Sequence, residues 1–276
     1  MSIIKKLTIL LITGVIGLAG CNQDPKIEIR EDFNKYYHQN NIEGSFILFN
    51  QRENTYIYCN KDQSIQSYTP ASTFKICNSL IGLETKVIEN EHHIFRWDGI
   101  VRNPVWDKDH DLKSAFANST VWYYQKLARR VGEQQMKYWV EKAKYGNGSI
   151  AGGLDQFWLS GGLRITPEQQ IDFLQRLHRN EIPFSKRSTD IVKNIMIVKD
   201  TLNYVIRGKT GWGAQDSIDV GWYVGYVETK DNVYYFANCI QTKSNRLNDI
   251  QYAIQFDTAR TSIVNNILNK LSIIKE

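Results

Sequence analysis

Two side chains that could act together in nucleophilic chemistry, Ser72 and Lys75, lie three residues apart and just after Pro70. If a helix begins here, positions i and i+3 share a face, so the hydroxyl and the amine can point into one pocket. A desolvated lysine can take the proton of a serine that attacks a carbonyl group. The first turn would also direct backbone N–H groups toward the resulting oxyanion. Taken alone, the spacing also fits an N-capping serine followed by a solvated lysine.

Two further short runs carry matching chemistry. The run 209–211, Lys-Thr-Gly, follows the strand-like segment 203–208 and offers a cation, a hydroxyl and a backbone open to close approach. That combination suits an extended substrate with a carboxylate, held against the edge of a strand. The run 119–121, Ser-Thr-Val, can bring a second hydroxyl near the nucleophile.

In this order, Ser-x-x-Lys, Ser-x-Val and Lys-Thr-Gly resemble the motifs of the penicillin-recognising serine enzymes. The chain is most similar to the class D (oxacillinase-type) β-lactamases, because the middle motif is Ser-x-Val and because Tyr-Gly-Asn at 145–147 and Phe-Trp-Leu at 157–159 match in order and spacing. The segment 70–75, Pro-Ala-Ser-Thr-Phe-Lys, matches that family's nucleophile segment without a gap, and the resemblance extends over about residues 30 to 272.

The resemblance implies a catalytic role for four residues. Ser72 would be the nucleophile that forms an acyl-enzyme, and Lys75 would react with carbon dioxide to give an N6-carboxylysine that acts as general base. Trp158 would donate its indole N–H to this carbamate, since an indole can only donate. Ser119 would pass protons to the leaving nitrogen. Because carbon dioxide adds only to the neutral amine, Lys75 should lie in an apolar pocket that lowers its pKa.

The resemblance also implies a set of substrate-binding residues: Val121, Lys209, Thr210, Gly211, Trp212 and Arg260. Lys209 and Thr210 would bind the substrate carboxylate, and the backbone N–H groups of Ser72 and residue 212 would form the oxyanion hole. Val121, with Phe74 and Leu159, would wall the lysine pocket.

Two of these assignments rest on positions where the chain departs from the family pattern. Trp212 stands where the family more often has Phe or Tyr, so the rim near the substrate side chain is expected to differ. Arg260 is the predicted arginine partner of the carboxylate, and Arg246 is the rival because the segment 241–256 is longer than in many relatives.

The first 20 residues have the composition of an export signal. Lys5 and Lys6 precede the apolar run 7–19, which is too short to span a bilayer comfortably. The run 18–21, Leu-Ala-Gly-Cys, resembles the bacterial lipoprotein cleavage site, which predicts that Cys21 is lipidated and begins the mature chain. Ordinary cleavage nearby, with Cys21 incidental, is the alternative. Both predict an exported bacterial protein, either periplasmic or attached to a membrane through Cys21.

Composition limits the partners that we expect. Without Lys5 and Lys6 the formal net charge of +5 falls to +3, and the charged residues, 23% of the chain, form no long block. Nucleic acid is therefore not an expected partner. The histidines and cysteines lack metal-type spacing, so we expect no metal and no cofactor beyond carbon dioxide or bicarbonate for Lys75. The expected partners are β-lactam antibiotics, and a homodimer is left open.

The distribution of strand and helix patterns predicts the fold. Strand patterns at 44–50 and 55–59 form a hairpin, and others return at 203–209, 219–228 and 232–241. Residues 72–200 are mainly helical, and a last helix is expected near 258–271. This order predicts a single catalytic domain over 21–276 with an α+β, β-lactamase/transpeptidase-like fold. An antiparallel sheet of about five strands would be flanked by N- and C-terminal helices and would carry a large helical insertion.

Other readings of the serine motif fit less well. A Ser-His-Asp hydrolase would require Gly-x-Ser-x-Gly, and the nearest approach, residues 158–162, has tryptophan in first place. A β-lactam sensor domain and a penicillin-binding peptidase share the chemistry but keep a long-lived acyl-enzyme. The first is normally tethered to transmembrane helices and the second usually has Ser-x-Asn. We therefore expect a class D β-lactamase that confers β-lactam resistance, with a substrate range set by the loops around Trp106, Trp212 and residues 213–218.

Overall fold

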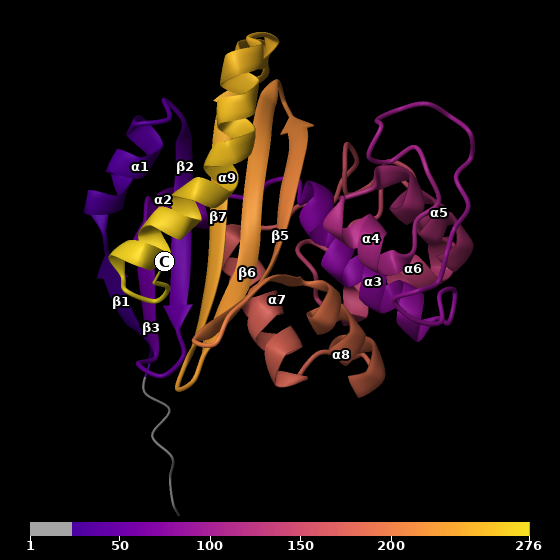
Figure 1. Cartoon of the computed structure of the whole chain (residues 1–276), viewed down its shortest axis with the longest axis horizontal. Coiled ribbons are helices and arrows are strands. Elements are labelled where there is room, and N and C mark those ends of the chain that lie inside the picture. Colours follow the sequence, from indigo (N-terminus) through magenta and orange to yellow (C-terminus); the bar gives the residue numbers. More distant parts are fainter. Residues whose placement is uncertain (1–23, 276) are drawn as a thin grey trace, which may run out of the picture.

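A computed structural model describes residues 24–275, so the predicted signal sequence and Cys21 lie outside the described part of the chain. Strands from both ends of this region form one sheet in the order β1-β3-β2-β7-β6-β5-β4 (Figure 1). The strands are β1 (Lys26–Ile29), β2 (Glu43–Asn50), β3 (Thr55–Cys59), β4 (Ile197–Asp200), β5 (Tyr204–Gln215), β6 (Ile218–Thr229) and β7 (Val233–Lys243).

The predicted α+β fold is confirmed, but the sheet has seven strands where the sequence led us to expect about five. The two additional strands, β1 and β4, lie at the two edges, and β1 runs parallel to β3. Each contains four residues and all are exposed, so neither strand has a buried face that would mark it in the sequence. The central strands β2, β7, β6 and β5 pair in antiparallel fashion, as predicted.

The helices between β3 and β4 form the expected insertion. They are α2 (Lys61–Ser64), α3 (Lys75–Glu84), α4 (Leu112–Ala117), α5 (Val121–Val131), α6 (Glu133–Lys142), α7 (Pro167–Arg179) and α8 (Lys186–Ile195). The start of α7 follows from local chemistry. Thr166 Oγ1 accepts from the Gln169 backbone N–H, and Gln169 Oε1 accepts from the Thr166 backbone N–H. Pro167 takes the first helical position.

Two helices outside the insertion, α1 (Asn34–His38) and α9 (Ile250–Lys270), cover one face of the sheet (Figure 1). The last helix begins eight residues before the predicted position, because the Asp249 side chain accepts from the backbone N–H groups of Gln251 and Tyr252 and caps it there. The opposite face packs against α7, and the same apolar core continues into α3, α4, α5, α6 and α8. Both faces of β2 are therefore covered, which explains why seven of its eight residues are buried.

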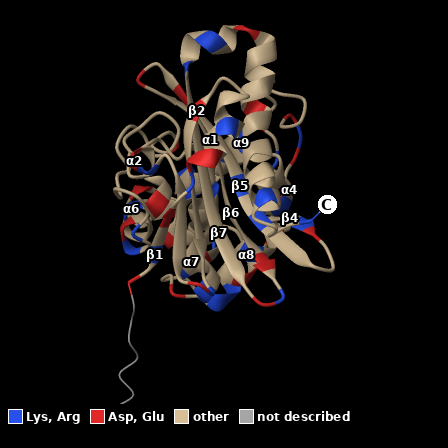
Figure 2. Ribbon diagram, turned by 90° about the vertical axis from the view of Figure 1, so that its left-hand side faces the viewer, with Lys and Arg blue, Asp and Glu red and all other residues tan. Residues whose placement is uncertain are grey.

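The surface carries mixed charges. Lys and Arg lie among Asp and Glu on the side shown in Figure 2, in keeping with the dispersed charges of the sequence. Among the described helices, none is long and apolar enough to cross a membrane.

Candidate active site

Ser72 and Lys75 meet at the start of the first long insertion helix. A 3₁₀ turn (Ala71–Phe74) leads directly into α3, and Lys75 Nζ donates to Ser72 Oγ over 2.6 Å. Lys75 has no exposed surface, and Ser72 is 8% exposed. The predicted i, i+3 contact is therefore present, although Ser72 lies inside a 3₁₀ turn and does not cap an α-helix.

Two glycines of β5 allow this turn to pack against the sheet. A Cβ atom on Gly211 would lie 3.1 Å from the Pro70 carbonyl oxygen, and one on Gly213 would lie 3.0 Å from Ala71 Cβ. Side chains at these positions would push the turn away from the strand. Ala71, directly before the nucleophile candidate, has φ of 46°, a region that L-residues other than Asn and Asp rarely occupy. The close approach therefore fixes Ser72 beside the Lys-Thr-Gly segment in a strained local backbone.

Aromatic rings lie at Lys75 and at the neighbouring Phe74. The Tyr124 ring centroid lies 5.3 Å from Lys75 Nζ, and Phe74 stacks on Trp158 with 5.5 Å between ring centroids. This burial lowers the pKa of Lys75 well below the usual value for lysine, and the charge of Lys209 lowers it further. A neutral amine is therefore favoured at the position where a base is needed.

The indole of Trp158 is fully buried, and its Nε1–H has no acceptor among the described residues. A buried donor without a partner is uncommon, because it loses its bonds to water without replacement. Trp158 and Phe74 are held in the same aromatic cluster, which places this donor in the core beside the nucleophile turn. This buried indole N–H can therefore donate to one further acceptor.

Ser119 and Val121 lie where α4 gives way to α5. Ser119 has φ of 54°, and Val121 is half-buried at the first position of α5. The end of α4 reaches the Lys-Thr-Gly segment, since Lys209 Nζ lies 5.6 Å from the Phe116 ring centroid. A second serine with a left-handed backbone is thus brought to the side of the site that Lys209 occupies.

Two cations stand along β5. Burial lowers the pKa of Lys209 to about 7, and the nearby charge of Arg260 contributes. Arg260 comes from α9 on the other side of the sheet, and its Nη1 donates to the Gly211 carbonyl oxygen over 3.0 Å. Arg246, the rival in the sequence, donates instead to the Asn41 carbonyl oxygen. The structure therefore brings Arg260 to the Lys-Thr-Gly segment.

The side chain of Trp212 is turned toward α9. Its ring packs against Phe256 with 5.3 Å between centroids, and its Nε1 donates to Asp219 over 2.6 Å. The guanidinium of Arg260 lies 5.5 Å from the same ring. Trp212 therefore supports the arginine and the strand, and in the chain it lies between Gly211 and Gly213, which pack against the nucleophile turn.

The Tyr-Gly-Asn run at 145–147 anchors the loop that carries Trp158. Asn147 Oδ1 accepts from the Arg164 backbone N–H over 3.0 Å, and Asn147 Nδ2 donates to the Gly162 carbonyl oxygen over 3.0 Å. Gly146 has φ of 55°, and a Cβ there would lie 2.1 Å from the Arg164 carbonyl oxygen. The run matched a family pattern in the sequence, and in the structure it holds the two ends of this loop together.

Sequence reasoning missed two residues of this site. Tyr124 faces Lys75, and Gln170 Nε2 donates to Thr73 Oγ1 over 2.8 Å within the nucleophile turn. Tyr124 could have been found, since it lies three residues after Val121 on the same predicted helix face. Gln170 could not, because 97 positions separate it from its partner.

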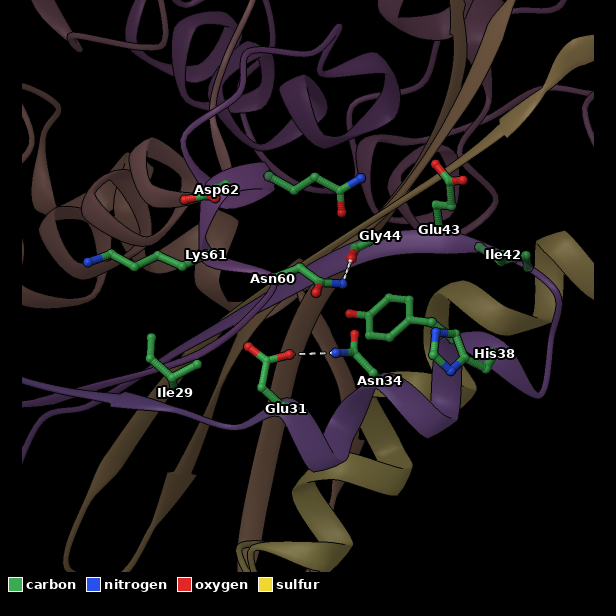
Figure 3. A pocket seen from close by; sticks show the side chains of 12 residues that line it. Ile29, Glu31, Asn34, His38, Ile42, Glu43, Gly44, Asn60, Lys61 and Asp62 are labelled. Carbon is green, nitrogen blue, oxygen red and sulfur yellow. Dashed lines mark hydrogen bonds between the residues drawn. The ribbon is translucent and has the colours of Figure 1, made fainter.

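One cavity of the described region lies away from these residues. It has a volume of about 650 Å³ and opens between β1, α1 and the segment 60–63, where Figure 3 shows Glu31 and Asn34 hydrogen-bonded to each other. None of the predicted site residues lines it, and β1 is at the opposite edge of the sheet from β4. The candidate active site is therefore not in this cavity.

Comparison with known proteins agrees with the fold. Residues 32–269 match the penicillin binding protein transpeptidase domain. The chain is 41% identical over 210 residues to the probable β-lactamase YbxI of Bacillus subtilis, covering 75% of this chain and 78% of that protein. It is 37% identical over 238 residues to β-lactamase OXA-48 of Klebsiella pneumoniae, covering 86% and 89%.

Solved structures of relatives give the same result. A class D β-lactamase from Sebaldella termitidis superposes with a TM-score of 0.85 at 35% identity, covering 92% of this chain and all of that one. The class D β-lactamase YbXI from Nostoc superposes with a TM-score of 0.80 at 44% identity, covering 87% and 98%. The chain therefore belongs to the class D β-lactamases, serine enzymes within the penicillin-binding transpeptidase family.

Proposed function

We propose that this chain hydrolyses β-lactam antibiotics in two steps through an ester on Ser72. The observation that carries the proposal is the contact of 2.6 Å between the fully buried Lys75 amine and Ser72 Oγ, beside the cations Lys209 and Arg260. In the first step Ser72 Oγ attacks the lactam carbonyl carbon, the C–N bond breaks, and the ring nitrogen takes a proton. In the second step water attacks the ester and releases the opened acid and Ser72.

We further propose that Lys75 acts as general base after its nitrogen is carboxylated by carbon dioxide. A carbamate oxygen would accept a proton from Ser72 or water, which a protonated ammonium cannot do. Three features of the chain support this: the absence of exposed surface at Lys75, its lowered pKa, and the buried Trp158 Nε1–H without an acceptor among the described residues. Trp158 would hold the added carboxylate.

The remaining predicted residues would bind and orient the substrate. Lys209, Thr210 and Arg260 would pair with its carboxylate, and Gly211 lets the substrate lie close to β5. Backbone N–H groups of Ser72 and Trp212 would stabilise the oxyanion. Ser119 would deliver the proton to the leaving nitrogen, and Val121 would shield the base from bulk water.

Steady-state hydrolysis of a chromogenic cephalosporin, with and without added bicarbonate, tests the proposal. We expect many turnovers per enzyme and a higher rate with bicarbonate, because added carbon dioxide favours the carboxylated lysine. A single stoichiometric burst would contradict hydrolysis and would favour the sensor or peptidase alternative, in which the ester on Ser72 persists. Turnover that is indifferent to bicarbonate, even after its depletion, would contradict the carboxylated base.

A further inference from the structure

We propose that the cavity beyond Lys209 is a subsite for the substituent on the carboxylate-bearing ring of the substrate, and that Val198 determines its selectivity. This inference rests on the proposed function and specifies one part of its substrate range. The cavity has a volume of about 340 Å³ and shares Lys209 and Thr210 with the candidate active site. That volume is within the range that holds small-molecule groups in proteins.

The subsite exists because β4 stops pairing with β5 before the Lys-Thr-Gly segment. Ile197 pairs with Arg207, and the Gly208 N–H donates to the Met196 carbonyl oxygen over 2.9 Å. Beyond Gly208, no strand in the described part of the chain pairs with this edge of β5. The end of α8 and the first residues of β4 therefore form a wall that begins where the carboxylate-binding residues end.

A β-bulge directs Val198 into this wall. The β4–β5 register shifts between Ile197 and Lys199, which leaves Val198 as the extra residue. Bulges commonly redirect a side chain beside an active site. Val198 lines the cavity and is 59% exposed, so its methyl groups are available to a ligand. Gly208 also lines the cavity. A Cβ at this position would lie 2.7 Å from the Tyr223 ring, so a side chain there would collide with that ring.

The chemistry of the lining points to an apolar or aromatic group attached close to a carboxylate. Lys209 is the one charged residue among those that line the cavity, and the others are mainly apolar: Phe116, Ala117, Ile195, Met196, Ile197 and Val198. In a bicyclic β-lactam the carboxylate is carried by the ring fused to the lactam. If that carboxylate binds at Lys209 and the lactam carbonyl lies at Ser72, a substituent on the neighbouring ring carbon would lie next to the cavity that Lys209 and Thr210 line.

Two cephalosporins with one acyl side chain test the subsite, one with methyl and one with styryl on the ring carbon beside the carboxylate-bearing carbon. The measured quantity is the ratio of their kcat/KM values, since kcat/KM includes every step up to acylation. We expect Val198→Ser to lower kcat/KM for the styryl compound by about fourfold, and to change it by less than about twofold for the methyl compound, because part of one apolar contact is lost.

Two further variants complete the test. Ala117→Leu, at an exposed position on the cavity rim, should narrow the entrance and lower the same ratio. Leu202→Ser, fully exposed and outside the lining, should leave the ratio unchanged. Equal effects of Val198→Ser on both compounds, or none on either, would overturn the subsite.

The same variants distinguish failure of the subsite from failure of the proposed function. If both compounds acylate Ser72 without turnover, as detected by intact mass, hydrolysis is refuted while the ratio of acylation rates still tests the subsite. If neither compound acylates Ser72, both proposals are refuted.

Discussion

Lys75 combines two properties that rarely occur together, since it is fully buried and makes no ion pair within the described residues. Burial of an amine costs folding free energy unless the amine loses its proton. The charge of Lys209 acts in the same direction, because two neighbouring ammonium groups repel each other. A site that favours a neutral amine next to a serine is costly for stability and useful for chemistry.

Replacement of this amine should therefore affect activity more than folding. We expect Lys75→Ala to lower turnover by about 10²–10⁴-fold, the usual contribution of a general base. The melting temperature should stay close to that of the parent chain, because the substitution removes a polar group that resists burial. Turnover at the parental rate would refute Lys75 as the base.

Trp158 should act through the lysine. We expect Trp158→Phe to slow deacylation more than acylation and to make the rate depend more strongly on bicarbonate, because the donor to the carboxylated lysine is lost while the aromatic ring remains. Trp139→Phe is the matched control: its Nε1 is also buried without an acceptor in the described region, but it lies in α6 and stacks on Phe184. Equal slowing of both steps would indicate that Trp158 only packs.

We expect activity to fall both at low pH and above neutral pH. Carboxylation requires neutral Lys75, so activity should fall as pH drops below the lowered pKa of that amine. Carboxylate binding requires protonated Lys209, whose pKa of about 7 predicts a fall in kcat/KM above neutral pH. Added bicarbonate should shift the fall in kcat/KM at alkaline pH to a higher pH, because a negative charge on Lys75 raises the pKa of Lys209. A fall at alkaline pH that persists unchanged in Lys209→Arg would contradict the assignment.

At the scale of elements, the site depends on how closely the nucleophile turn approaches β5 and on how the 145–165 loop is locked. Gly211 and Gly213 permit the first, and Asn147 secures the second. The helical insertion and the five longer strands were predicted from their local patterns. The edge strands β1 and β4 were not, because a strand of four exposed residues is defined by its neighbour and not by its own pattern.

Release of the loop should harm catalysis. We expect Asn147→Ala to destabilise the fold by about 1–3 kcal/mol, since backbone groups lose their partners. Turnover should fall further than stability alone explains, because Trp158 is carried on the same loop. Asn265→Ala, at an exposed position on α9, is the control and should change neither quantity. Turnover at the parental rate in Asn147→Ala, at a temperature where the variant is folded, would contradict a role of this loop in catalysis.

At the scale of the whole molecule, the sheet brings together two layers that are distant in the sequence. Ser72 and Lys75 come from the insertion on one face, and Arg260 comes from α9 on the other and reaches the Gly211 carbonyl oxygen. The export signal predicted for residues 1–20 lies outside the described part of the chain, so it remains a proposal from the sequence. With it we propose that the protein is exported and attached to a membrane through Cys21.

Lipidation can be tested on the full chain in a bacterial host. We expect the parent protein to incorporate labelled fatty acid and to sediment with membranes, and Cys21→Ser to do neither while retaining hydrolytic activity. The reason is that the acyl chains on Cys21 would hold the protein at the membrane, and Cys21→Ser removes their attachment point. Unlabelled parent protein in the soluble fraction would contradict lipidation and favour ordinary cleavage.

The sequence alone indicated the class of chemistry, the central strands and the helical insertion. Ser72 and Lys75 meet because their spacing follows the geometry of one helical turn, and that geometry is local. Tertiary structure decided which arginine reaches the Lys-Thr-Gly segment, where the ring of Trp212 lies, and that a cavity opens beyond Lys209. It also decided that Lys75 is buried, which sets the pKa of the proposed base. These outcomes depend on contacts between segments far apart in the chain, and no local spacing specifies them.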